Sequence, residues 1–175
     1  MEKPVTYSLW LEPTGDVAYK LQQRIKDLSK KHDTPVFSPH VTLLGGLTAS
    51  KTELVALTNT LVSSAPPFDL TLTKAGYRNT YYQSLFIHVA QNEGLTNLHS
   101  NACRLFDCPD EYKNEYMPHL SLLYGDLSQQ QKERILNKIG REFYIQFVAK
   151  KVVLLQTDGK PKEWKKIHTA MFKEK

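Results

Sequence analysis

The sequence predicts an α+β protein of two pseudo-symmetric lobes, each an antiparallel sheet with helices on its outer face, with a cleft between them. One motif occurs twice, as FSPHVTLLGG at residues 37–46 and YMPHLSLLYG at 116–125. Similar elements surround each copy, and consecutive strands within each half favour antiparallel pairing over a doubly wound parallel sheet. We therefore expect residues 1–175 to form one bilobal domain, with motif strands at 39–45 and 118–124.

The first half is predicted to alternate strands and helices. Residues 5–11 are rich in β-branched and aromatic residues and predict a strand, whereas apolar residues recur at helical spacing over 16–31. The first motif strand follows and ends at two glycines. Ser50 is followed three residues later by a glutamate, which predicts a capping box for the next helix. Residues 68–90 then predict two strands joined by a turn near Arg78 and Asn79.

The second half is predicted to repeat this order. Residues 93–106 have a helical pattern, and the second motif strand comes after them. Ser128 and Gln131 predict a capping box for the helix that follows. Residues 143–158 and 167–172 supply the last strands, with a lysine-rich turn between them.

Composition indicates an ordinary globular protein. The chain has 175 residues, of which 41% are hydrophobic and 23% charged. No segment reaches the ~18 consecutive apolar residues of a membrane helix, and the N-terminus does not resemble a secretory signal or a transit peptide. We expect a cytoplasmic monomer with no membrane partner. Cys103 and Cys108 are expected to be reduced thiols, with a small disulfide loop as the alternative.

The excess positive charge lies at the C-terminal end. The net charge is +5, and residues 1–149 carry equal numbers of basic and acidic side chains. The C-terminal lysines could bind a phosphate-rich partner, although a solvated surface is the simpler explanation. These are Lys150, Lys151, Lys160, Lys162, Lys165 and Lys166.

Each motif combines an imidazole with a hydroxyl. Residues two apart in a strand face the same way, so His40 lies beside Thr42 and His119 beside Ser121. Two histidines across a cleft suit in-line displacement at phosphorus, because one accepts a proton while the other donates one on the opposite side. Our working hypothesis makes His119 the base and His40 the acid, with the reverse order open. The hydroxyls would hydrogen-bond the phosphoryl oxygens.

The residues next to the motif histidines argue against a metal site. A catalytic zinc site usually has three protein ligands, and neither motif supplies an adjacent carboxylate or cysteine. We therefore expect no metal and no cofactor. The histidines without a duplicated partner are assigned to structure or surface; they are His32, His88, His99 and His168.

The two H-x-[ST] motifs, 79 residues apart, resemble the signature of the 2H phosphoesterase superfamily. YSLWLEP, TYYQSLF, YMPHLSLLYG and the late LLQTD and EWKKIHTAMF resemble the plant and fungal cyclic phosphodiesterases. The resemblance implies that His40, Thr42, His119 and Ser121 are catalytic. It also implies that Trp10 and Tyr124 line the cleft and bind substrate.

The same resemblance implies metal-independent hydrolysis of small cyclic phosphate nucleotides. Such enzymes open ADP-ribose 1″,2″-cyclic phosphate, which arises from tRNA splicing, to ADP-ribose 1″-phosphate, and nucleoside 2′,3′-cyclic phosphates to 2′-phosphates. Ser84 stands where some relatives have a cysteine, which leaves the substrate preference open. The alternatives are an enzyme acting on RNA termini, including a 2′-5′ RNA ligase-like enzyme, and a nucleotide-binding module without activity.

Overall fold

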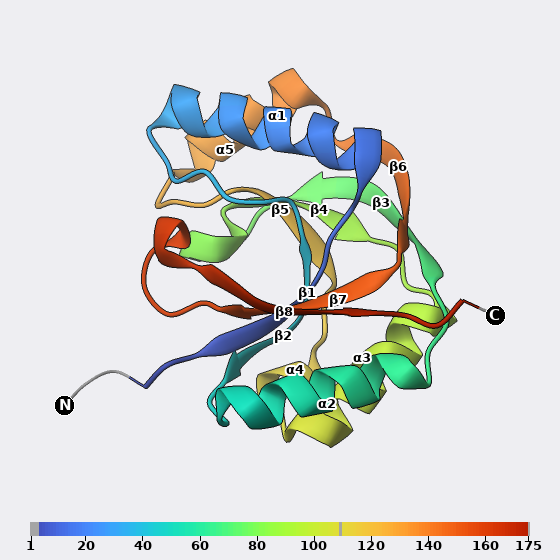
Figure 1. Ribbon diagram of the computed structural model, residues 1–175. Helices are drawn as coiled ribbons and strands as arrows, with labels where there is room; N and C mark the ends of the chain where they lie inside the picture. The colour runs from blue at the N-terminus through green and yellow to red at the C-terminus, as the bar shows by residue number, and fades with distance from the viewer. Residues whose placement is uncertain (1–3, 109, 175) are drawn as a thin grey trace.

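A computed structural model describes residues 4–108 and 110–174 and places eight strands in one sheet (Figure 1). The strand order is β6-β3-β4-β5-β2-β1-β7-β8, and every neighbouring pair is antiparallel. The α+β class and the antiparallel pairing are therefore confirmed. The strands are β1 (Tyr7–Leu11), β2 (Val41–Leu47), β3 (Phe68–Gly76), β4 (Leu85–Val89), β5 (His119–Leu123), β6 (Glu142–Ala149), β7 (Lys151–Gln156) and β8 (Lys165–Met171).

The two lobes meet at the motif strands. Strands β6, β3, β4 and β5 form one half of the sheet, and β2, β1, β7 and β8 form the other. The halves join where β2 pairs with β5, with Val41 opposite Leu120. The motif strands are thus direct neighbours at the centre of the sheet. His40 immediately precedes β2, whereas His119 is the first residue of β5.

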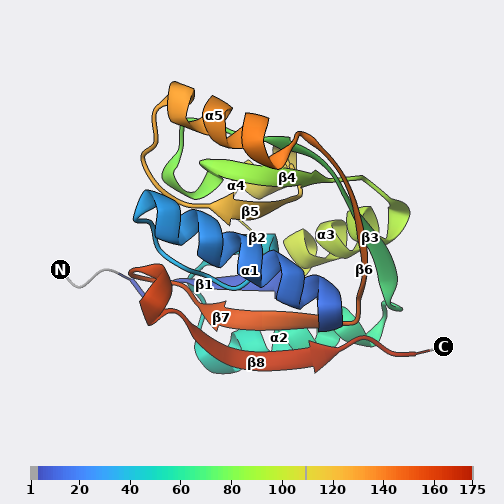
Figure 2. The same ribbon diagram turned by 90° about the horizontal axis from the view of Figure 1, so that it is seen from above.

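The helices lie in two groups on opposite sides of the strands. Figure 1 shows α1 with α5 on one side and α2 with α3 and α4 on the other. Helix α1 follows β1 but contacts β5 and β6, and α3 follows β4 but contacts β2 and β3. Each of these helices therefore ties one half of the sheet to the other, as the view in Figure 2 also shows. The helices are α1 (Gly15–His32), α2 (Lys51–Ser63), α3 (Glu93–Phe106), α4 (Asp110–Asn114) and α5 (Gln129–Ile139).

The expected helix starts are present, with one difference between them. At α5, Ser128 and Gln131 form both hydrogen bonds of a capping box. At α2, the Ser50 side chain accepts a bond from the Glu53 N–H, the first of the two bonds expected. The expectation of a strand throughout residues 81–90 is wrong at its start, because Tyr81–Gln83 form a 3₁₀ turn, η1.

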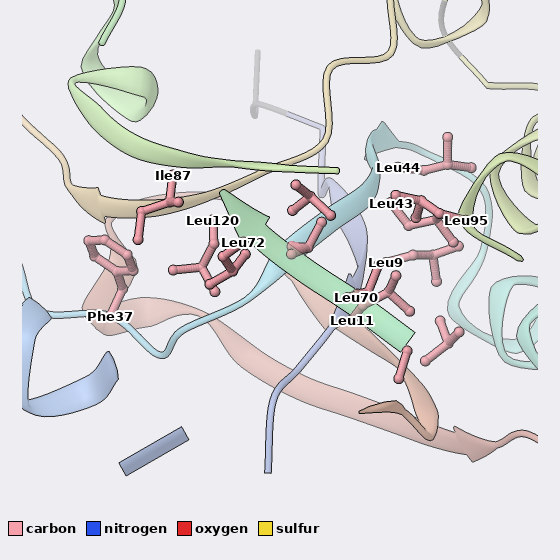
Figure 3. Close-up of a cluster of buried hydrophobic side chains, with 14 of the residues drawn as sticks. Leu9, Leu11, Phe37, Leu43, Leu44, Leu70, Leu72, Ile87, Leu95 and Leu120 are labelled. Carbon is pink, nitrogen blue, oxygen red and sulfur yellow. The ribbon is translucent and has the colours of Figure 1, made fainter. Parts of the chain in front are cut away.

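The central strands have one apolar face and one functional face. Leu9 and Leu11 of β1, with Leu43 of β2 and Leu120 of β5, belong to the main hydrophobic core (Figure 3). The alternating positions carry the predicted site residues, as period-2 geometry requires. In the described part of the chain, no helix is both long and apolar enough to cross a membrane.

Candidate active site

A cavity of about 850 Å³ opens between the two halves of the molecule. Residues of β1, β2 and β5 line it, together with the turn before β4 and the segment that includes α4. The structure brings together all of the residues that the sequence nominated. His40, Thr42, His119, Ser121, Trp10 and Tyr124 all line this cavity.

Both imidazoles are held in the same way. The Nδ1 of His40 lies 2.6 Å from the Ser38 carbonyl, and the Nδ1 of His119 lies 2.9 Å from the Met117 carbonyl. In each case the ring donates its Nδ1–H to the residue two positions earlier, which leaves Nε2 as the nitrogen available for proton transfer. A proline lies between the histidine and the accepting residue in both motifs. Proline holds the preceding residue in an extended conformation, so the repeated Pro-His pair fixes the direction of the carbonyl.

The surroundings of the two imidazoles differ. The His40 ring stacks on the Trp10 indole at a centroid distance of 3.4 Å and an angle of 5°, and the residue is 5% exposed. Burial lowers the pKa of His40 to about 3, and the charge of His119 adds to this effect. His40 is therefore neutral in the unliganded protein near pH 7.

His119 is less deeply buried and has polar neighbours. Its ring lies 5.1 Å from that of Phe86, tilted by 58°. Burial is again the main cause that lowers the pKa of His119, and the charges of His88 and Arg78 lower it further. His88 faces His119 across the β4–β5 pair and acts on this imidazole electrostatically, an influence that its assignment to structure or surface did not include.

Neighbouring segments also position the hydroxyl-bearing residues of the site. Thr42 lies opposite Trp10, and Ser121 lies opposite Phe86. The Ser121 hydroxyl donates a hydrogen bond to the Tyr82 carbonyl at 3.0 Å. Burial raises the pKa of the Tyr124 phenol, so this group remains a protonated donor at neutral pH.

The leading aromatic residue of each motif contacts the other motif. Phe37 stacks on Tyr124 with ring centroids 3.7 Å apart. The Tyr116 hydroxyl donates to the Thr42 carbonyl at 3.0 Å. The aromatic residue of each motif therefore contacts the other motif, which accounts for its presence in both copies.

Among the lining residues that were not nominated from the sequence are Tyr82, Trp164 and Arg78. Tyr82 and Trp164 are more accessible than Trp10 and Tyr124, which are each only 3% exposed, and the partly buried Tyr112 and Tyr116 also line the cavity. Arg78 is the one lysine or arginine among the described lining residues. The carbonyl of Arg78 accepts a bond from the buried Lys132 ammonium, which holds this loop against α5. Tyr82 lies within TYYQSLF and Trp164 within EWKKIHTAMF, two segments that resemble the plant and fungal cyclic phosphodiesterases. The local sequence pattern predicted only a strand for the first residue and a turn for the second, so neither was nominated for the site.

The C-terminal lysines lie outside this cavity. Lys151 and Lys166 flank the buried carboxylate of Glu12, at 3.3 and 2.9 Å. Lys166 also lines a second cavity of about 320 Å³ on the far side of Trp10 and Trp164. The phosphate-binding role considered for these lysines therefore has no basis in the main cavity.

Two further expectations concern sulfur and metal ligands. Cys103 and Cys108 are free thiols, and burial raises the pKa of the Cys103 thiol to about 12. Within residues 4–108 and 110–174, no group of three or more His, Cys, Asp or Glu side chains is arranged to hold a metal ion.

Comparisons with known proteins identify related sequences and structures. The sequence model of the 2′-5′ RNA ligase superfamily matches residues 17–161, more than half of the chain. A cyclic phosphodiesterase from Arabidopsis thaliana is 22% identical over 136 residues, which cover 78% of this chain and 74% of the plant protein.

Solved structures share the fold across almost the whole chain. The protein TT0787 of Thermus thermophilus superposes with a TM-score of 0.72 at 15% identity, covering 97% of this chain and 98% of that one. LigT of E. coli, complexed with 3′-AMP, gives a TM-score of 0.65 at 16% identity and covers 98% and 100%. At these identities the likeness establishes the fold.

Proposed function

Because the chain belongs to the 2′-5′ RNA ligase superfamily, the group of the 2H phosphoesterases, we propose that it hydrolyses small cyclic phosphodiesters. The expected resemblance to this superfamily is confirmed at the level of the family. The proposed reactions are the opening of ADP-ribose 1″,2″-cyclic phosphate to ADP-ribose 1″-phosphate and of nucleoside 2′,3′-cyclic phosphates to 2′-phosphates.

The observation that carries this proposal is the pair of matched imidazoles in one cavity. His40 and His119 each have Nδ1 bonded to a backbone carbonyl, and each has a strand hydroxyl two residues away. A displacement at phosphorus has its attacking and leaving oxygens roughly in line, so it needs proton transfer on two opposite sides. A cavity that holds one oriented imidazole from each half of the protein supports this arrangement.

In the proposed mechanism, Nε2 of His119 takes a proton from water as the water oxygen attacks phosphorus. The bond from phosphorus to one ribose oxygen breaks, and protonated His40 gives its proton to that oxygen. The Thr42 and Ser121 hydroxyls donate to the non-bridging phosphoryl oxygens, where negative charge accumulates. Ser121 must turn its single proton away from the Tyr82 carbonyl to do so.

The pKa shifts support this order of roles. The shallower burial of His119 leaves it the stronger base, whereas the strongly lowered pKa of His40 makes its imidazolium a ready proton donor. His40 must gain its proton when substrate binds, because it is neutral in the free protein. The negative charge of a bound phosphodiester favours that protonation.

Substrate class is supported by the relatives and by charge. The similar plant protein is a cyclic phosphodiesterase, and E. coli LigT, which shares this fold, forms a complex with 3′-AMP. Arg78 is the only lysine or arginine among the described lining residues, which also include Asp110 and Glu115, so the cavity offers no row of cations for a chain of phosphates. An enzyme acting on RNA ends, or a 2′-5′ RNA ligase, is the second candidate, because the superfamily carries that name.

The test is hydrolysis in EDTA of ADP-ribose 1″,2″-cyclic phosphate and the four nucleoside 2′,3′-cyclic phosphates. Wild type should turn over at least one of them, and His40→Ala and His119→Ala should each reduce kcat by about 10²- to 10⁴-fold. His168→Ala, which removes a histidine of β8 outside the cavity, is the matched control and should retain activity. No turnover of any of the five by folded wild type would reject the proposal in favour of RNA ends or binding alone.

A further inference from the structure

The aromatic residues nominated from the sequence cannot offer a stacking surface to a nucleobase. Trp10 has one ring face covered by His40, and Tyr124 has one covered by Phe37. Both residues are only 3% exposed. They form the back wall of the cavity, so a base that enters it must find its aromatic contacts elsewhere.

Tyr82 and Trp164 provide such contacts from opposite halves of the molecule. Tyr82 belongs to the η1 turn before β4, and Trp164 follows the 3₁₀ turn Pro161–Glu163 before β8. Their ring centroids are 6.2 Å apart and their planes differ by 36°, so the two rings form a wedge. Tyr82 is 49% exposed and Trp164 is half-buried. Tyr124 lies close to both rings, roughly perpendicular to Tyr82 and steeply inclined to Trp164.

The centroid separation of 6.2 Å sets an upper limit on the spacing between the two ring faces. Aromatic carbons in contact are about 3.5 Å apart, so a base between two rings requires about 7 Å between them. The gap must therefore widen by at least about 1 Å for a base to enter, and rotation of the exposed Tyr82 side chain can supply this change. The backbone beneath it is fixed, since the Tyr81 carbonyl accepts from the Gly125 N–H and the Tyr82 carbonyl accepts from the Ser121 hydroxyl.

The wedge is joined directly to the candidate catalytic groups. Trp164 packs edge-on against Trp10 at 5.5 Å, and Trp10 stacks on His40. On the other side, the Tyr82 carbonyl is bonded to the Ser121 hydroxyl. A phosphorus atom between the two histidines would therefore place its own nucleoside beside the wedge.

Resting on the proposed function, we propose that Tyr82 and Trp164 clamp the nucleobase of the ribose that carries the cyclic phosphate. This base subsite serves nucleoside 2′,3′-cyclic phosphates and favours purines, because their two rings overlap more of both side chains. In ADP-ribose 1″,2″-cyclic phosphate, the ribose that reacts carries no base. That substrate would not use the clamp in this way.

The kinetic test compares adenosine 2′,3′-cyclic phosphate with glycerol 1,2-cyclic phosphate, which has the same reacting ring and no base. Tyr82→Ala and Trp164→Ala should each lower kcat/KM for the adenosine substrate about 5- to 150-fold more than for the glycerol substrate, mainly through KM. Tyr82→Phe keeps the ring and should therefore retain the preference for the adenosine substrate over the glycerol substrate. Tyr144→Ala, which removes an exposed tyrosine of β6, should leave the ratio between the substrates unchanged.

Equal losses on both substrates would show that these side chains only support the cavity, and the clamp would be rejected. The same conclusion follows if wild type does not distinguish the two substrates by KM. An independent binding measurement uses adenosine 2′-phosphate, which has no cyclic ester, and follows quenching of tryptophan fluorescence. Quenching by this nucleotide should disappear in Trp164→Phe, which retains Trp10 as the only tryptophan. Quenching without any turnover would retain the clamp and reject the proposed hydrolysis.

Discussion

The two motif strands give their histidines the same hydrogen bond and different environments. In both, Nδ1 donates to the carbonyl before a proline, which is a local feature that the ten-residue repeat carries with it. The environment comes from neighbouring strands: Trp10 of β1 covers His40, whereas Phe86 and His88 of β4 flank His119. Duplication of a motif therefore reproduces ring orientation, while the pKa of each ring depends on residues outside the motif.

The largest expected effect is a difference in kcat between variants of the two histidines, because one histidine is proposed to act as the base and the other as the acid. A good leaving group needs no proton, so its departure is insensitive to loss of the acid. Catechol cyclic phosphate has such a group, because a phenol has a pKa of about 10. His40→Ala should lose about 10²- to 10⁴-fold in kcat on adenosine 2′,3′-cyclic phosphate and far less on the catechol ester. His119→Ala should lose a similar factor on both substrates.

Steady-state rates of the two variants on the two substrates decide the assignment. If His119→Ala is the variant rescued by the catechol ester, the roles of the two histidines are reversed. His168→Ala serves as the control, since His168 bonds Asn59 outside the cavity. If the catechol ester restored kcat equally in both variants, one histidine could not be the acid and the other the base.

A smaller effect is expected on stability in acid, where the two histidines should contribute differently to the pH dependence of the unfolding free energy. Because the folded-state pKa of His40 is below that of the unfolded chain, the unfolded state binds a proton more readily as pH falls. The resulting stabilisation of the native state is present above about pH 6.5 and is lost as pH falls toward 3. At pH 5 the loss from His40 should be about 2 kcal/mol.

Urea unfolding of wild type, His40→Gln and His119→Gln at pH 8 and pH 5 measures this contribution. The difference in unfolding free energy between the two pH values should shrink most in His40→Gln. His119→Gln should give a change in the same direction, and a smaller one given its shallower burial. An unchanged pH dependence in His40→Gln would show that its imidazole titrates normally in the folded protein.

The same contrast explains what could be predicted from the sequence. The Pro-His-x-hydroxyl pattern, the helical residues 93–106 and the Ser128 cap depend on residues close together in the chain, and these predictions agree with the structure. The neighbours that set the His40 pKa, and the pairing of Tyr82 with Trp164, depend on strand order. The strand assignment of Tyr81 failed because Gly125 and Ser121 hold its turn from a distant strand.

The smallest expected effect concerns the prolines that both motifs share. Pro39→Ala and Pro118→Ala should each lower the free energy of unfolding by about 0.4–1 kcal/mol, because alanine allows the unfolded chain more conformations. Each also frees the preceding residue, whose carbonyl orients the imidazole, so kcat should fall several-fold. The two sites are not equivalent, since the Val89 N–H of β4 donates to the Pro118 carbonyl at 3.0 Å and holds that segment in place.

We therefore expect Pro39→Ala to reduce kcat more than Pro118→Ala, although their effects on stability should be similar. Parallel measurement of kcat and of urea unfolding for both variants makes the comparison. Proline fixes its own φ and limits its predecessor, and the bond to β4 duplicates part of that restraint at Pro118 alone. A larger kcat loss in Pro118→Ala would mean that strand pairing does not substitute for proline in aiming the catalytic ring.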